Sequence, residues 1–124
     1  MLYSIALAFA AHDDACTLPF DAAGAPLPPF AEDARVRVHG CAVEADHTGE
    51  PSEQARDRLW SAYTEWLSVM GYVPVREEHR APWNQARWQW FEHQGQFVEL
   101  QVRRPDRADV WRVMLLPKAA GAPW

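Results

Sequence analysis

The strongest constraint on the fold is an alternation of apolar and polar residues, with a period of two, that runs through residues 86–116. Successive side chains on a β-strand point to opposite faces, so this period is typical of strands that bury one face. Two such runs, 88–92 and 96–102, flank a short turn that ends at Gly95, and a third run covers 110–116. The pattern therefore predicts an antiparallel meander of three strands.

The length of the turn decides which side chains of this meander share a face. A three-residue loop, with Gly95 in the left-handed conformation, pairs Glu92 with Gln96, whereas a two-residue loop pairs His93 with Gln96. We prefer the three-residue loop because it separates apolar from polar side chains more completely, and because Gln-Gly is not a favoured two-residue turn. Its apolar face holds Trp88, Trp90, Val98, Leu100, Val102, Trp111, Val113 and Leu115.

Helical spacing appears in one clear segment, residues 52–70. Ser52 is suited to the N-cap position, and the carboxylates of Glu50 and Glu53 complement the helix dipole at that end. Gly71 is expected to end the helix. One apolar stripe results, made of Leu59, Tyr63, Trp66, Leu67 and Met70.

Three further segments alternate in the manner of strands. Residues 2–10 and 35–43 are expected to be strands, with Val36 and Val38 of the second facing the core. Residues 72–80 form another expected strand, in which Pro74 marks either an edge or a delayed start. Pro117 is expected to end the third strand of the meander.

The remaining segments are expected to be irregular. Residues 12–33 form a long loop rich in proline and glycine, residues 44–51 an acidic loop, and residues 118–124 a loose tail. Apolar side chains are expected to attach the long loop to the body of the protein, namely Phe20, Leu27 and Phe30.

Taken together, these elements predict an α+β fold, in which a mostly antiparallel sheet of about five or six strands carries one long helix on one face. A chain of 124 residues can build one core without disulfides or metals. We therefore expect a single domain over residues 1–124.

Charge is distributed unevenly along the chain. Residues 1–57 hold ten acidic and three basic residues, a net charge of −7, and residues 58–124 hold seven acidic and nine basic residues, a net charge of +2. The acidic half argues against direct binding of nucleic acid, which needs clustered basic residues. It fits a protein partner with a basic surface, or solubility alone.

The chain is expected to be cytoplasmic and not embedded in a membrane. No apolar run approaches the length that spans a bilayer, roughly 20 residues. The first eleven residues lack the basic start of a signal peptide, and their alternation favours a strand instead.

Motifs for catalysis and cofactor binding are missing from the sequence, so no cofactor is expected. Four residues in two loops could hold a zinc ion, namely His12, Cys16, Cys41 and His47. Their spacing matches no standard zinc pair, so the sequence predicts free thiols and surface histidines rather than a metal site.

Two surfaces are candidate binding sites. The first is acidic and consists of Glu44, Asp46, Glu50 and Glu53, which could dock a basic protein. The second is the polar face of the meander, where Phe91 is expected to lie opposite Phe97 among charged residues, as in protein interfaces. The candidates on this second surface are Arg87, Phe91, Phe97, Glu99 and Arg103.

The sequence thus predicts a small protein-binding domain without catalytic activity, which inhibits or neutralises a partner enzyme as immunity-type or anti-defence proteins do. The alternative is a small-molecule-binding protein or small enzyme, whose aromatic pocket would lie between the sheet and loop 12–33. Residues proposed to line that pocket are Tyr72, Trp83, Phe91 and Phe97. A homodimer built by sheet pairing is a third hypothesis.

Overall fold

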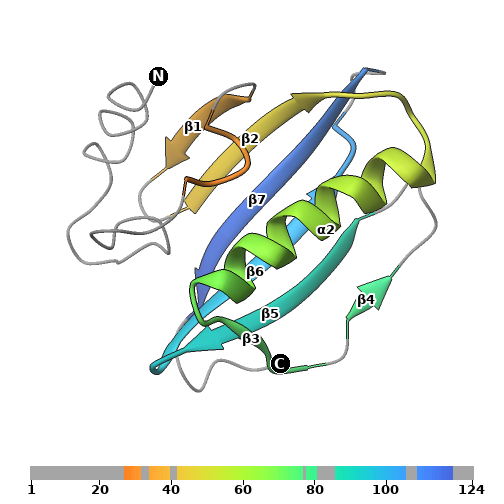
Figure 1. Cartoon of the computed structure of the whole chain (residues 1–124). Helices are drawn as coiled ribbons and strands as arrows, with labels where there is room; N and C mark the ends of the chain where they lie inside the picture. Colours follow the sequence, from red (N-terminus) through yellow and green to blue (C-terminus); the bar gives the residue numbers. More distant parts are fainter. Residues whose placement is uncertain are drawn as a thin grey trace.

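A computed structural model of the chain describes residues 27–31, 34–39, 42–76, 78–80, 86–105 and 109–118. Within this part, seven strands form one antiparallel sheet and a single long helix lies across one face of it (Figure 1). The predicted α+β architecture is confirmed. The elements are β1 (Arg35–His39), β2 (Ala42–Thr48), α2 (Glu53–Val69), β3 (Val73–Pro74), β4 (His79–Arg80), β5 (Arg87–His93), β6 (Gln96–Arg103) and β7 (Val110–Lys118).

The order of strands across the sheet is β1-β2-β7-β6-β5-β3, and β4 also pairs with β5. The strand β7 therefore lies between β2 and β6, and joins the β1–β2 hairpin to the C-terminal meander. In Figure 1, β1 and β2 lie on one side of α2 and β3 and β4 on the other. Among the described residues, no helix is both long enough and apolar enough to cross a membrane.

The helix begins and ends with strong local signals. The Ser52 hydroxyl accepts a hydrogen bond from the Ala55 amide at 3.1 Å, as predicted for an N-cap. At the other end, Gly71 adopts a φ of +93°, which favours glycine. The amide of Tyr72 donates to the Leu67 carbonyl at 2.9 Å and that of Gly71 to the Ser68 carbonyl at 3.0 Å, which together make a Schellman motif.

The turn between β5 and β6 corrects the preferred register. His93 pairs with Gln96, so the loop has two residues, and the prediction of a three-residue loop was wrong. Gln94 adopts a positive φ of 52°, which is uncommon for a residue other than glycine, and Gly95 has a φ of 81°. The Glu92 carboxylate accepts a hydrogen bond from the Gly95 amide at 2.8 Å and supports this tight turn.

A shift of one residue reverses the two faces of β5. Phe91 lies on the face that α2 covers, and Trp88 and Trp90 lie on the opposite face, which we call the far face. The far face also carries Phe97, Glu99, Arg103, Arg112, Met114 and Leu116 on the neighbouring strands. On the helix side of the sheet, the residues of β6 and β7 predicted for the core do lie in it. They are Val98, Leu100, Val102, Trp111, Val113 and Leu115.

Segment 27–31 adds one aromatic side chain to the core. Phe30 is buried and its ring stacks on Tyr63 and meets Trp66 edge-on, both at 6.3 Å between ring centroids. Phe30 therefore attaches this segment to α2, as predicted. Leu27 is 53% exposed and does not, and Phe20 lies outside the described residues.

The segment after β1 is a strand rather than the predicted acidic loop. β2 extends to Thr48, and Val43 and Ala45 point into the core while Glu44 and Asp46 lie on the far face. The alternation of period two thus continues past residue 43, because arginines on neighbouring strands compensate the acidic side chains. Gly40 and Cys41, between β1 and β2, lie outside the described residues.

Two prolines lie in strands, at positions where, among the described residues, a neighbouring strand is missing on one side. The predicted strand 72–80 is divided into two short strands, and Pro74 in β3 lies at an edge, as predicted. The expectation that Pro117 ends the last strand was wrong, because β7 continues to Lys118. The pairing of β7 with β2 ends at Leu115, so a residue without an amide proton is tolerated beyond it. The strand predicted at 2–10 and nearly all of the 118–124 tail lie outside the described residues.

A candidate binding pocket beside the helix

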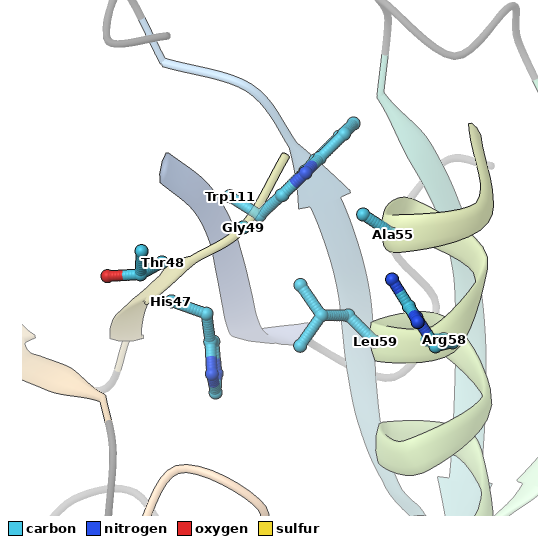
Figure 2. Close-up of a pocket in the computed structure, with 7 residues that line it drawn as sticks. All are labelled: His47, Thr48, Gly49, Ala55, Arg58, Leu59 and Trp111. Carbon is cyan, nitrogen blue, oxygen red and sulfur yellow. The ribbon is translucent and has the colours of Figure 1, made fainter. Parts of the chain in front are cut away.

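A pocket of about 620 Å³ lies between the end of β2 and the first turns of α2, with β7 beneath it. Figure 2 shows Arg58 and Leu59 reaching from the helix, with His47 of β2 and Gly49, just beyond the end of β2, across from them. The Thr48 side chain points away from the helix in this view. The lining residues are His47, Thr48, Gly49, Ala55, Arg58, Leu59 and Trp111.

The floor of the pocket is held in place by Trp111. This side chain is fully buried, and its indole Nε1 donates a hydrogen bond to the Glu50 carbonyl at 2.7 Å. Gly49 passes so close that a Cβ atom there would lie 3.0 Å from Trp111 Cδ1. The Gly49 amide also donates to the Asp109 carbonyl at 2.9 Å, so the chain is fixed where it leaves β2.

His47 forms one wall of the pocket and is held by Tyr63 of α2. Its Nε2 lies 2.6 Å from the Tyr63 hydroxyl oxygen, and the two rings meet edge-on with centroids 5.6 Å apart. Tyr63 is fully buried, and burial raises the pKa of its phenol well above the ordinary value, so the hydroxyl keeps its proton. A buried hydroxyl proton needs an acceptor, and Nε2 can accept it when the neutral imidazole carries its own proton on Nδ1. We assign this tautomer from the hydrogen-bond geometry.

Arg58 stands at the rim of the pocket. Its side chain is 73% exposed, and its Nη2 lies 3.6 Å from Oε1 of Glu50, which is 63% exposed. This separation exceeds hydrogen-bond distance, and exposed ion pairs contribute little to stability. Of the described residues that line the pocket, Arg58 alone carries a formal charge when His47 is neutral.

The predicted acidic surface divides into two parts. Glu44 and Asp46 lie on the far face in a network of ion pairs, with Asp46 2.9 Å from Arg112 and 3.1 Å from Arg37, and Glu44 3.3 Å from Arg37. Burial opposes ionisation of Asp46, but hydrogen bonds from Arg112 and Arg37 outweigh it and lower the pKa of this carboxyl. The charges of these two acids are therefore largely compensated within the protein.

The other two predicted acids remain exposed near the start of α2. Glu50 pairs loosely with Arg58, and Glu53 lies 3.6 Å from the guanidinium of Arg56, which is fully buried. Of the four acidic candidates, these two present the more accessible negative charge to a partner.

The predicted surface on the meander does not form one patch, because the register differs. Phe91 lies in the core and Phe97 on the far face, so the expectation that they oppose each other was wrong. On the far face, the buried Glu99 accepts a hydrogen bond from Trp90 Nε1 at 2.7 Å, and Arg103 is exposed.

Arg87, also predicted for that surface, lies on the helix side of β5. Its guanidinium forms ion pairs with Glu78 and, at 2.9 Å, with Asp57 of α2. It also lies over the Trp60 ring, 4.5 Å from the centroid. Arg87 thus ties the helix to the edge of the sheet.

Of the four residues proposed for zinc, the structure describes only His47; His12, Cys16 and Cys41 lie outside the described residues. Within the described part of the chain, no three His, Cys, Asp or Glu side chains are grouped so that they could hold a metal ion. His47 faces the pocket instead.

The pocket was not anticipated in this place. The proposed aromatic lining does not form it, since Phe91 and Tyr72 are buried elsewhere in the core and Trp83 lies outside the described residues. A signal for it was present, because continuing the alternation of 43–45 to residue 47 places His47 on the helix side. Comparisons with protein-family models, with curated proteins and with solved structures found no match.

Proposed function

We propose that this protein binds a small molecule in the pocket between β2 and α2. The observation that carries the proposal is the pocket itself, whose volume of about 620 Å³ falls within the range typical of ligand sites, roughly 300–1,000 Å³. Its lining combines apolar surface from Leu59 and Ala55 with polar groups from His47 and Arg58. Ligand sites commonly have this mixture, in which a few polar groups orient a largely apolar contact.

The proposal concerns binding and assigns no reaction. General acid–base or nucleophilic catalysis requires several groups that converge on one reacting atom. At this pocket the imidazole of His47 is engaged with a tyrosine hydroxyl that lies behind it in the core. This arrangement orients the imidazole, which is what a recognition site requires.

The proposal can be tested by a fragment screen followed by amide NMR spectra of the whole protein. We expect fragments that bind to shift the amide signals of Thr48, Gly49 and Leu59 together. The variant Leu59→Trp would fill the pocket and abolish these shifts. The matched control is Val69→Trp, which adds the same side chain at a position 68% exposed near the other end of the helix. Binding that survives Leu59→Trp, or that maps elsewhere, would contradict the proposal.

A second candidate function is docking of a basic protein, as an inhibitor of an enzyme would require. It is supported by the exposure of Glu50 and Glu53 at the start of α2. We expect affinity capture from a host lysate to yield one dominant basic protein that salt releases. The double variant Glu50→Lys/Glu53→Lys should lose it, and Glu65→Lys, an exposed change further along the helix, should retain it. Capture that is unaffected by the double variant would exclude docking through these acids.

A further inference from the structure

Building on the small-molecule binding proposed above, we infer that the ligand is an organic acid, whose anionic group Arg58 receives and whose apolar body lies against Leu59. The inference concerns the chemistry of the ligand. It depends on the charges, the donors and the apolar surface that this pocket presents.

The charge of the lining favours an anion. Arg58 supplies one positive charge, and none of the described residues that line the pocket is an aspartate or a glutamate. A guanidinium presents N–H groups in a planar fork that matches a carboxylate or phosphate. An amine in the same position would meet the cation of Arg58, and the carboxylate beside it, that of Glu50, is already paired with Arg58 and lies outside the lining.

The Glu50 carboxylate competes with an anionic ligand for the guanidinium of Arg58. The two side chains are 3.6 Å apart and both are mostly exposed, so their pair is weak and easily exchanged. An anionic ligand can replace the Glu50 carboxylate without leaving a buried charge uncompensated. The same carboxylate would weaken ligand binding by repulsion, so its removal should strengthen binding.

His47 supports the same ligand chemistry through its tautomer. Because Nε2 accepts the Tyr63 hydroxyl proton, the neutral ring is a hydrogen-bond donor at Nδ1 and not an acceptor there. In this tautomer neither His47 nor Arg58 offers an acceptor to a ligand. Donors select acceptor oxygens, which organic acids provide.

The apolar part of the lining indicates that the rest of the ligand is apolar. Leu59 projects between strand and helix in Figure 2, and Ala55 lies one turn earlier on the same side of α2. Gly49 leaves the strand side without a side chain, over the buried Trp111 ring. A flat or short apolar group fits this surface better than a strongly hydrated one.

Three aromatic probes of similar size and different charge test the inference, namely benzoate, benzyl alcohol and benzylamine. Each would be titrated into the protein at low salt up to its solubility limit, with the amide signals of Thr48, Gly49 and Leu59 as the readout. We expect benzoate to bind about two- to fivefold more tightly than either other probe, as expected for an ion pair with an exposed guanidinium.

Variants of the two charged side chains provide the controls. Arg58→Gln should bring benzoate down to the affinity of benzyl alcohol, and Glu50→Gln should raise benzoate affinity by about two- to fivefold, as expected for an exposed charge pair. Arg35→Gln removes an exposed arginine on β1 and should leave all three affinities unchanged.

The outcomes separate this inference from the proposal on which it rests. Equal binding of the three probes, or benzoate binding that survives Arg58→Gln, would overturn the acidic ligand and leave the pocket as a binding site. If no probe and no library fragment shifts these amides, the proposed function fails as well.

Discussion

Two corners of the molecule combine a buried tyrosine with a histidine from a strand, and they do so with different results. Beside β2, His47 is hydrogen-bonded to Tyr63 at 2.6 Å and one side of its ring borders the pocket. Beside β5, His93 Nδ1 lies 3.1 Å from the Gly71 carbonyl, and the ring packs on Tyr72 with centroids 5.2 Å apart. A Cβ atom on Gly71 would lie 2.7 Å from the His93 ring, so this corner is closely filled.

The difference shows what each pair contributes. At the β5 corner, the tyrosine and histidine close the end of the helix where the chain turns into β3. At the β2 corner, the hydrogen bond directs the histidine while space remains beside it. The same two residue types therefore complete the packing in one place, whereas in the other the buried tyrosine holds a histidine that lines a pocket.

The largest effect is expected from the aromatic cluster that supports the pocket corner. Phe30→Ala removes a buried ring that stacks on Tyr63, so we expect a loss of about 3–5 kcal/mol in the free energy of unfolding. Urea denaturation would measure it. Leu27→Ala, an exposed change in the same segment, should alter stability by less than about 0.5 kcal/mol. Comparable losses in both variants would mean that Phe30 is not the anchor of this segment.

The packed corner can be tested at its glycine. Gly71→Ala places a side chain at a φ of +93° and against His93, so we expect a loss of about 2 kcal/mol or more. Gly49→Ala, at the pocket corner, has no such φ and meets one atom of Trp111 at 3.0 Å, so about 1 kcal/mol is expected. Thermal and urea unfolding of both variants would show whether this order holds; the reverse order would contradict the contrast between the corners.

Removing each tyrosine hydroxyl compares the strength of its hydrogen bond at the two corners. Tyr63→Phe removes a short, partly buried hydrogen bond and should destabilise the protein by about 1–2 kcal/mol. Tyr72→Phe removes a bond to Gln96 at the limiting distance of 3.5 Å and should cost less than about 0.5 kcal/mol.

Nitrogen-15 NMR of the imidazoles provides a readout that stability alone does not. In the unmodified protein at alkaline pH, His47 should carry its proton on Nδ1. Tyr63→Phe should shift this balance towards Nε2, and Tyr72→Phe should leave it unchanged. A His47 protonated on Nε2 in the unmodified protein would contradict the assignment of Tyr63 as the donor.

The smallest effect is expected behind the pocket, where Asp46 ties β2 to its neighbours. Its pKa is lowered in the folded protein, so its contribution to stability is present above its ordinary pKa of 3.8 and is lost as the pH falls through the lower, folded value. We expect this carboxyl to make part of the stability depend on acid, and Asp46→Asn should remove that dependence. Urea unfolding between pH 6 and pH 3 would measure it, and an unchanged pH profile in the variant would refute the assignment.

Local signals in the sequence identified the helix and the two faces of the last strand. Ser52 and Gly71 act through bonds to residues within a few positions, so their roles follow from nearby sequence. The faces of β7 followed from its alternation, because Trp111, Val113 and Leu115 are all apolar.

The errors arose where distant residues decide the structure. Trp90 resembles a core residue, but the buried Glu99 binds its indole on the far face and Lys118 lies 5.6 Å from its ring. Glu44 and Asp46 resemble loop residues until Arg37 and Arg112 are brought beside them. The pocket depends on this same extension of β2, so its position could not be derived from local pattern alone.

The central position of β7 has a consequence for the order of folding. The hairpins β1–β2 and β5–β6 connect residues that are close in sequence, so each can form rapidly. They become one sheet only when β7 inserts between them, and its Arg112 then meets Asp46 across 66 residues of chain. Closing a loop of that length costs chain entropy before any contact offsets it, so it is slow. Pairing of β7 with β2 is therefore the step that should limit the folding rate.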